Sequence, residues 1–87
     1  MEKAKLKVAV ISPDRTVFDG QADMVVAPAW DGQVGILLGH APMLALLGDG
    51  DLRVTDGTKE SKFHVAGGFL QVADDVVTVL SEQATEA

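Results

Sequence analysis

Short apolar segments with a period of two are the feature that most limits what this chain can fold into. They lie at residues 6–10, 52–54, 63–65 and 77–79, where apolar residues alternate with polar or small ones. Successive side chains of a β-strand point to opposite faces of a sheet, so this alternation predicts strands with one buried face. No window of about eleven residues keeps a helical period without a glycine. The pattern therefore predicts an all-β sandwich or barrel.

Turn-forming residues separate these segments and set the number of strands. Glycine, proline and aspartate favour turns because of their backbone conformations and short side chains. The predicted turns lie at Pro13-Asp14, Asp19-Gly20, residues 48–51 and Asp56-Gly57. Further short strands are predicted at 16–18, 23–28 and 43–47, the last because it is too short for a helix. At least six strands follow from this pattern.

Residues 81–87 differ from the rest of the chain because they are polar and rich in Glu and Ala. We predict a polar tail there, which can begin a helix but is too short to complete one. The 87 residues are expected to form one domain, residues 1–87, because two hydrophobic cores would not fit in this length.

Composition excludes several classes of function. Without cysteine, the chain has no disulfide, no thiolate zinc site and no cysteine nucleophile. Its net charge of −6 has the wrong sign for binding phosphate backbones, so no nucleic-acid partner is expected. No apolar run approaches the roughly 20 residues that span a bilayer, and we expect no direct insertion into a membrane.

Residues 31–43, with the sequence DGQVGILLGHAPM, combine three glycines, a proline and a histidine with apolar residues. Glycine permits backbone angles closed to other residues, while Pro42 fixes its own φ and drives Ala41 towards an extended conformation. The chain also contains SPDRTVFDG at 12–20, AGGFLQV at 66–72 and VTVLSEQA at 77–84. Taken in their order along the chain, these four motifs resemble the N-terminal domain of the epsilon subunit of F-type ATP synthases, from about Leu6 to Ala84.

The resemblance implies a flattened β-sandwich of about ten short, mostly antiparallel strands, a count that comes from the family and not from the spacing here. It implies a rotor subunit of the central stalk, which binds the gamma subunit, seats on the c-ring and couples proton transport to rotary ATP synthesis. Such a subunit is not an enzyme and needs no cofactor or small-molecule ligand. It is a peripheral protein at the cytoplasmic face of the bacterial inner membrane, or inside an organelle in a eukaryote.

Two sets of site residues are also implied by the resemblance. The expected gamma-subunit interface consists of Gly39, His40, Ala41, Pro42 and Met43. The expected turn that faces the c-ring consists of Trp30, Asp31, Gly32 and Gln33. Many family members have glutamate where this chain has Gln33, so either Asp31 supplies the charge or the contact is purely polar.

Most epsilon subunits continue past the sandwich into a two-helix hairpin, which regulates the enzyme in many of them and binds ATP in some bacteria. The sequence ends at Ala87. The resemblance therefore implies that this chain supports assembly and coupling without an ATP-sensitive brake. No phosphate-binding loop of the G-x-x-x-x-G-K-S/T kind is present either.

Other classes of function stay open on the residues alone. A free-standing β-sandwich could bind a sugar or peptide with His40 and Trp30 lining its site, although 5% aromatic content argues against it. An acid–base enzyme would use Asp31 with His40. A metal site would need His40 and His64 joined by a carboxylate such as Asp31 or Asp56, but the spacing of these residues does not identify such a site.

Three features have a structural interpretation beside the functional one. His40 either hydrogen-bonds its own loop or contacts a partner, whereas His64 is expected on the exposed face of a strand. Trp30 either caps the core or belongs to a docking surface. The pair Gly67-Gly68 marks either a bend between sheets or the close approach of a partner's backbone.

Overall fold

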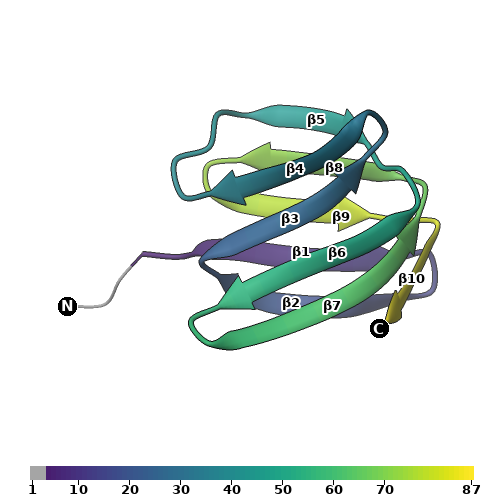
Figure 1. Cartoon of the computed structure of the whole chain (residues 1–87), viewed down its shortest axis with the longest axis horizontal. Coiled ribbons are helices and arrows are strands. Elements are labelled where there is room, and N and C mark those ends of the chain that lie inside the picture. Colours follow the sequence, from purple (N-terminus) through teal and green to yellow (C-terminus); the bar gives the residue numbers. More distant parts are fainter. Residues whose placement is uncertain (1–3) are drawn as a thin grey trace.

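The computed structural model describes residues 4–87, which form ten β-strands in two sheets (Figure 1). Residues 1–3 of the predicted domain lie outside the described residues. The strands are β1 (Leu6–Ser12), β2 (Arg15–Ala22), β3 (Met24–Ala29), β4 (Gly32–Leu37), β5 (Met43–Leu46), β6 (Gly50–Asp56), β7 (Lys59–Ala66), β8 (Phe69–Ala73), β9 (Val76–Leu80) and β10 (Gln83–Glu86). No helix occurs in residues 4–87. The predicted all-β sandwich is confirmed.

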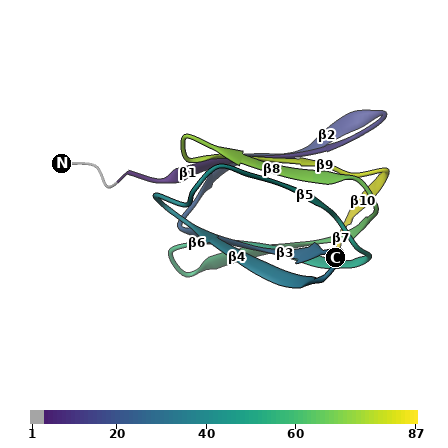
Figure 2. The ribbon, with the colours of Figure 1, turned by 90° about the horizontal axis from the view of Figure 1, so that it is seen from above.

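The two sheets pack face to face as the layers of a sandwich (Figure 2). The first has the strand order β2-β1-β9-β8-β5, and the second has the order β10-β7-β6-β3-β4. Neighbouring strands are antiparallel except β1 and β9, which run parallel. Because β1 and β9 come from distant parts of the sequence, their pairing ties the two ends of the chain into one sheet.

The core lies between the sheets and takes every second residue of the strands. In β1, Leu6, Val8 and Val10 are buried, while the intervening Lys7 is exposed. The same alternation in β6, β8 and β9 buries Leu52, Val54, Leu70, Val72, Val77 and Val79. Burial of these apolar side chains is the main favourable contribution to folding, and the period-two pattern of the sequence is what produces it.

The predicted turn at Asp19-Gly20 is wrong, because β2 continues through both residues to Ala22 and pairs them with β1. A Cβ on Gly20 would lie 3.0 Å from the ring of Phe18, so glycine leaves room there for this aromatic side chain. The Phe18 ring packs edge-to-face on Phe63 of β7, with 5.5 Å between the ring centroids. The Asp-Gly pair therefore serves packing between the sheets and not chain reversal.

The predicted start of a helix in residues 81–87 is also wrong, since Gln83–Glu86 form β10. This strand pairs antiparallel with β7 and becomes the edge of the second sheet. Ala84 is buried, and the buried hydroxyl of Ser81 donates a hydrogen bond to the carbonyl of Gln83 at 2.6 Å. Backbone pairing and this burial outweigh the helix preference of Glu and Ala, which is weak.

Gly67 and Gly68 form the corner between β7 and β8, where the chain passes from one sheet to the other. Both have positive φ, 68° and 110°, a region that glycine enters freely and other residues do not. A Cβ on Gly68 would lie 1.9 Å from the carbonyl oxygen of Leu80 at the end of β9. The bend between sheets is therefore confirmed, and the backbone that approaches closely is the chain's own.

Lys5 ties the start of β1 to the second sheet. Its ammonium donates a hydrogen bond to the carboxylate of Asp56 and lies 3.8 Å from that of Asp23. Asp23 also accepts a hydrogen bond from the amide of Gly57 at 2.7 Å. The hydrogen bond to Asp56, together with the charges of both carboxylates, raises the pKa of Lys5 above its ordinary value of 10.5.

We expect Lys5→Met to lower the melting temperature at neutral pH, and we expect this loss to shrink in strong alkali. A lysine with a raised folded-state pKa stabilises the fold below its unfolded-state pKa of about 10.4, and the contribution disappears as pH rises through the folded-state pKa. Thermal unfolding of both proteins at pH 7 and at about pH 11.5 measures this. Lys7→Met, at an exposed position, is the control. A melting-temperature gap that stays constant with pH would contradict the expectation.

Candidate functional site

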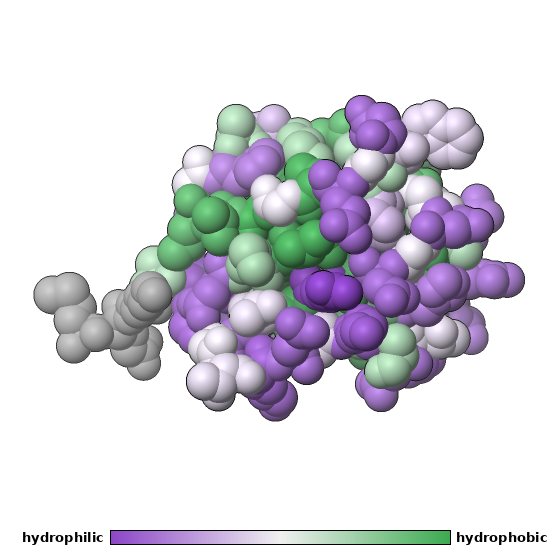
Figure 3. Space-filling model, viewed as in Figure 1, coloured by the Kyte–Doolittle hydropathy of each residue, from purple (hydrophilic) through white to green (hydrophobic). Residues whose placement is uncertain are grey.

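The outward faces of the two sheets differ, and the difference singles out one of them as a contact surface. In the second sheet, Arg53 pairs with Lys62 and Asp51 pairs with His64 across β6 and β7. Figure 3 views this sheet from outside: polar residues cover β6 and β7, and apolar residues gather over β3 and β4. Charged and polar side chains thus keep the β6–β7 half of this face in contact with water.

The outward face of the first sheet carries a row of apolar side chains across four strands. Leu46 of β5 pairs with Phe69 of β8, and Leu80 of β9 pairs with both Phe69 and Ile11 of β1. Leu44 lies two residues from Leu46 on the same side of β5 and is 72% exposed. We call Ile11, Leu44, Leu46, Phe69 and Leu80 the outer apolar face. Large apolar side chains gathered on one surface are typical of sites that another protein covers.

Residues 38–42 connect β4 with β5 and pass from the edge of one sheet to the edge of the other, and the loop at 39–42 is the part of this connection that the sequence singled out. His40 is held by its own segment: its ring Nδ1 donates to the carbonyl of Ala41 at 2.7 Å, and its backbone amide donates to the carbonyl of Leu37 at 3.1 Å. The structural interpretation of His40 is therefore confirmed. Met43 lies outside the loop, since it begins β5 and packs half-buried against the core. The exposed loop residues are Gly39, Ala41 and Pro42.

Asp75 fixes this loop from outside, and no sequence motif identified it. Its carboxylate accepts a hydrogen bond from the amide of Gly39 at 2.7 Å, and its carbonyl accepts one from the amide of Lys7 at 2.9 Å. Asp74 and Asp75 form the turn between β8 and β9, and both have positive φ, which aspartate tolerates better than most residues. The pair Asp74-Asp75 between two apolar strands is the sequence feature from which this turn could have been predicted.

We expect Asp75→Gly to loosen the loop while preserving the β8–β9 turn. Glycine adopts positive φ readily but offers no acceptor to the amide of Gly39. Hydrogen exchange of that amide, followed by NMR, should become about tenfold faster, which corresponds to the loss of one hydrogen bond to a charged group. Asp75→Asn keeps an acceptor oxygen and should accelerate exchange less. Equal acceleration in the two variants would contradict a role for the carboxylate.

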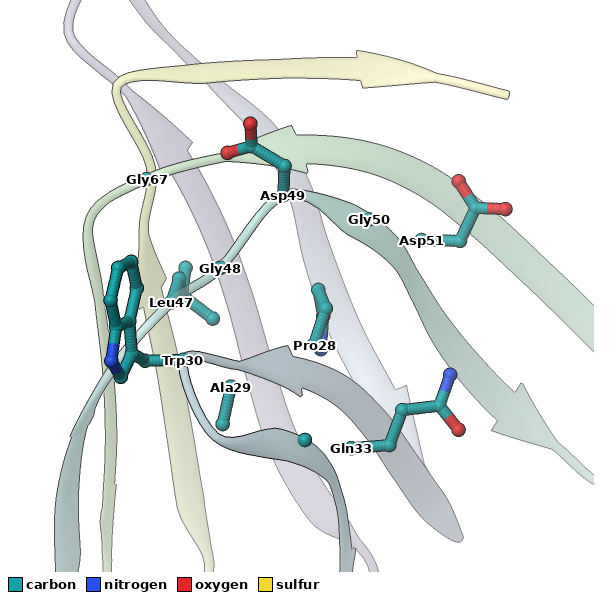
Figure 4. A pocket seen from close by; sticks show the side chains of 11 residues that line it. Pro28, Ala29, Trp30, Gln33, Leu47, Gly48, Asp49, Gly50, Asp51 and Gly67 are labelled. Atoms are coloured by element: carbon teal, nitrogen blue, oxygen red, sulfur yellow. The ribbon is translucent and has the colours of Figure 1, made fainter.

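The turn between β3 and β4 consists of Trp30 and Asp31, while Gln33 already belongs to β4. Trp30 is 79% exposed and does not cap the core. Figure 4 shows it at one end of a hollow, with Gln33 towards the other end and with Asp49 and Asp51 on the rim. The other expected residues of this turn, Asp31, Gly32 and Gln33, are all exposed.

His40 and Trp30 lie beyond opposite ends of β4, a strand of six residues that spans about 17 Å (Figure 1). The two side chains therefore line no common site, which argues against a ligand-binding module that uses both. The acid–base pairing of Asp31 with His40 fails for the same reason. The loop at 39–42 leads directly into β5, and Leu44 extends the outer apolar face towards it. The rest of that face, from Leu46 to Phe69 and Leu80, begins at the other end of β5, where the amide of Trp30 donates to the carbonyl of Leu46.

The two histidines belong to different parts of the fold. His64 is exposed on β7 as predicted, with its Nδ1 at 3.3 Å from Oδ1 of Asp51. Within residues 4–87, no group of three or more His, Cys, Asp or Glu side chains is arranged to hold a metal ion. The same part of the chain has no helix with the length and hydropathy to cross a membrane.

Comparison with known sequences points to one family. The family model for the β-sandwich domain of the ATP synthase delta/epsilon chain matches residues 5–87. An ATP synthase epsilon chain of Caulobacter vibrioides is 40% identical over 84 residues, which cover 97% of this chain and 98% of the relative. That of Brevibacillus brevis is 43% identical over 82 residues, and this chain spans only 62% of its length.

Comparison with solved structures shows the same fold. A chain in the Euglena gracilis mitochondrial ATP synthase complex of OSCP, F1 and c-ring superposes with a TM-score of 0.88 at 24% identity. The match covers 97% of this chain and 54% of that one. A chain of the central stalk and c-ring of the Tetrahymena thermophila mitochondrial ATP synthase gives 0.75 at 19% identity, over 98% and 69% of the two chains.

Proposed function

Because this chain belongs to the family of ATP synthase delta/epsilon chain β-sandwich domains, we propose that it is a central-stalk subunit of an F-type ATP synthase. In this role it binds the gamma subunit, seats on the c-ring and couples proton transport to rotary ATP synthesis. It is a non-catalytic subunit, which contributes rigidity and contacts and no reacting group. The observation that carries the proposal is the family match across residues 5–87, supported by relatives that are ATP synthase epsilon chains.

The gamma subunit is proposed to cover the outer apolar face together with the loop at 39–42. Leu44 follows that loop in β5, and Leu46 continues the face away from the loop to Phe69 and Leu80, so β5 joins the two parts of this surface. A shallow hollow of about 490 Å³ lies beside Phe69 and Leu80 and can accept a protruding side chain. Apolar side chains at the centre of an interface supply most of the binding energy of a stable contact.

The Trp30 turn is proposed to face the c-ring. It lies at the opposite end of β4 from the loop at 39–42 and borders the outer apolar face at Leu46, whose carbonyl accepts a hydrogen bond from the amide of Trp30. One rigid sandwich can therefore contact the c-ring with this turn and the gamma subunit with the adjoining face. A subunit held in this way is peripheral to the membrane. Its place is the cytoplasmic face of the bacterial inner membrane, or the interior of an organelle if the source is eukaryotic.

The charge of residue 33 tests the contact with the c-ring. We expect Gln33→Lys and Gln33→Glu to differ by at least about twofold in proton-driven ATP synthesis by reconstituted enzyme, because opposite charges interact oppositely with a polar loop. Binding to gamma should not change. The matched pair Thr58→Lys and Thr58→Glu places the same charges in the exposed turn between β6 and β7, away from the proposed contact. Equal synthesis rates from both Gln33 variants would mean that this turn faces solvent.

A further inference from the structure

The chain contains four pairs of aspartate followed by glycine: Asp19-Gly20, Asp31-Gly32, Asp49-Gly50 and Asp56-Gly57. Such pairs isomerise readily, because glycine has no side chain to keep its amide nitrogen away from the carboxyl carbon of the preceding aspartate. Where the backbone is paired or packed, the chain has to open locally before the two atoms can meet. The surroundings of the four pairs therefore decide which of them reacts in the folded chain.

Two of these pairs are held by contacts that the reaction would have to break. Asp19-Gly20 lies in the middle of β2 and is paired with β1 over both residues. At the end of β6, the carboxylate of Asp56 accepts a hydrogen bond from Lys5. The amide of Gly57 donates a hydrogen bond to the carboxylate of Asp23 at 2.7 Å. Both reacting groups of Asp56-Gly57 are therefore already engaged.

The third pair, Asp49-Gly50, is crowded by its neighbours. Gly50 begins β6, an inner strand of the second sheet, and pairs with Val65 of β7. A Cβ on Gly50 would lie 3.0 Å from the Cβ of Pro28, so little free space surrounds this residue. On the other side of Asp49, the amide of Gly48 donates to the carbonyl of Pro28 at 2.8 Å. The backbone is thus fixed on both sides of this aspartate.

The fourth pair, Asp31-Gly32, is the least constrained. Both of its residues are exposed, whereas each of the other pairs contains a half-buried residue. A Cβ on Gly32 would meet no heavy atom within 4 Å. Gly32 begins the edge strand β4 opposite Ala29, next to the turn, where local opening costs least. Its φ of 132° favours glycine, so the fold keeps the residue that makes this pair reactive.

We propose that Asp31 is the residue at which the folded chain forms isoaspartate. The amide nitrogen of Gly32 bonds to Cγ of Asp31, while the carboxyl hydroxyl and the amide hydrogen leave together as water, and a succinimide ring remains. Water then opens this ring. Attack at the side-chain carbonyl restores aspartate, and attack at the main-chain carbonyl gives isoaspartate, in which the backbone runs through Cβ and Cγ. The reaction needs no oxidant or cofactor.

Isoaspartate keeps the negative charge of residue 31 and lengthens the backbone of the turn by one methylene group. The turn lies outside the core, so the chain stays folded and acquires a second form of the β3–β4 hairpin. The proposal concerns the free chain and does not rest on the proposed function.

Ageing the folded chain in mildly acidic buffer, followed by denaturation and digestion with endoproteinase Asp-N, tests the proposal. This protease cleaves before aspartate and not before isoaspartate, so conversion of Asp31 replaces peptides 23–30 and 31–48 with an uncut peptide 23–48. We expect loss of cleavage at Asp31 to be at least about tenfold faster than at Asp19, Asp49 or Asp56. In guanidinium chloride, which unfolds the chain, the four rates should agree within about threefold.

An independent readout is methyl transfer by an L-isoaspartyl methyltransferase, which modifies isoaspartate and not aspartate. We expect the aged Asp31→Glu variant to lose most of this methyl acceptance, because glutamate keeps the charge but closes the corresponding larger ring far more slowly. The matched control Asp49→Glu should accept as much as the parent. Cleavage at Asp31 that persists as long as at the other three sites, or equal methyl acceptance by Asp31→Glu and the parent, would overturn the proposal.

Discussion

The substitution Gly68→Ala should destabilise the fold by more than about 3 kcal/mol. Its Cβ would lie 1.9 Å from the carbonyl oxygen of Leu80, so the corner between β7 and β8 must move away from β9. The φ of 110° adds a backbone cost that glycine alone avoids. For a domain of this size the loss corresponds to a fall in melting temperature of more than about 12 °C. Urea unfolding of the purified variant measures the free energy.

Two other glycines separate the steric part of this effect from the backbone part. Gly57 has a φ of 63°, and a Cβ added there would meet no heavy atom within 4 Å, so Gly57→Ala should cost only about 1 kcal/mol. Gly35 has neither a positive φ nor a close neighbour, and Gly35→Ala should be nearly neutral. If Gly68→Ala lowered the free energy of unfolding no more than Gly57→Ala does, the close approach of β9 would not determine the conformation of the corner.

The second large effect concerns binding of the gamma subunit. We expect Phe69→Asp to weaken this binding about thirtyfold, which corresponds to about 2 kcal/mol, because it places a charge at the centre of the outer apolar face. Leu44→Asp, farther from the centre of the row, should weaken binding about fivefold. Calorimetric titration of gamma with each variant gives the dissociation constants.

The control for these variants is Arg53→Asp. Arg53 is exposed in the middle of β6 in the second sheet, so this variant places the same negative charge outside both the outer apolar face and the loop at 39–42. Its binding to gamma should stay within about twofold of the parent. Melting temperatures of all three variants show whether each is folded before it is titrated. An Arg53→Asp effect as large as that of Phe69→Asp would mean that gamma does not distinguish the two sheets.

The alternation of apolar and polar residues predicted the strands well, because it reflects which side chains face the core. It failed where a distant contact decides the local structure. Asp19-Gly20 has the composition of a hairpin turn, but packing of Phe18 on Phe63 keeps it in β2. Residues 83–86 have little strand preference, and pairing with β7 makes them a strand. Neither Phe63 nor β7 is near these segments in sequence.

The candidate site was only partly predictable for the same reason. The loop around His40 could be found from its glycines and proline, because these residues restrict the local backbone. The outer apolar face could not, since Leu46, Phe69 and Leu80 become neighbours only through the register of three strands. Asp75 reaches Gly39 across 36 positions of sequence, which no local pattern records.

Titration of the purified gamma subunit with this chain tests the central claim most directly. If the chain is a central-stalk subunit, it should form a one-to-one complex with gamma that survives size-exclusion chromatography, and the complex should then attach to the c-ring. Binding should carry a negative heat-capacity change, since apolar surface is buried. A chain that is folded by thermal unfolding and yet forms no complex with gamma at high micromolar concentration would contradict the account.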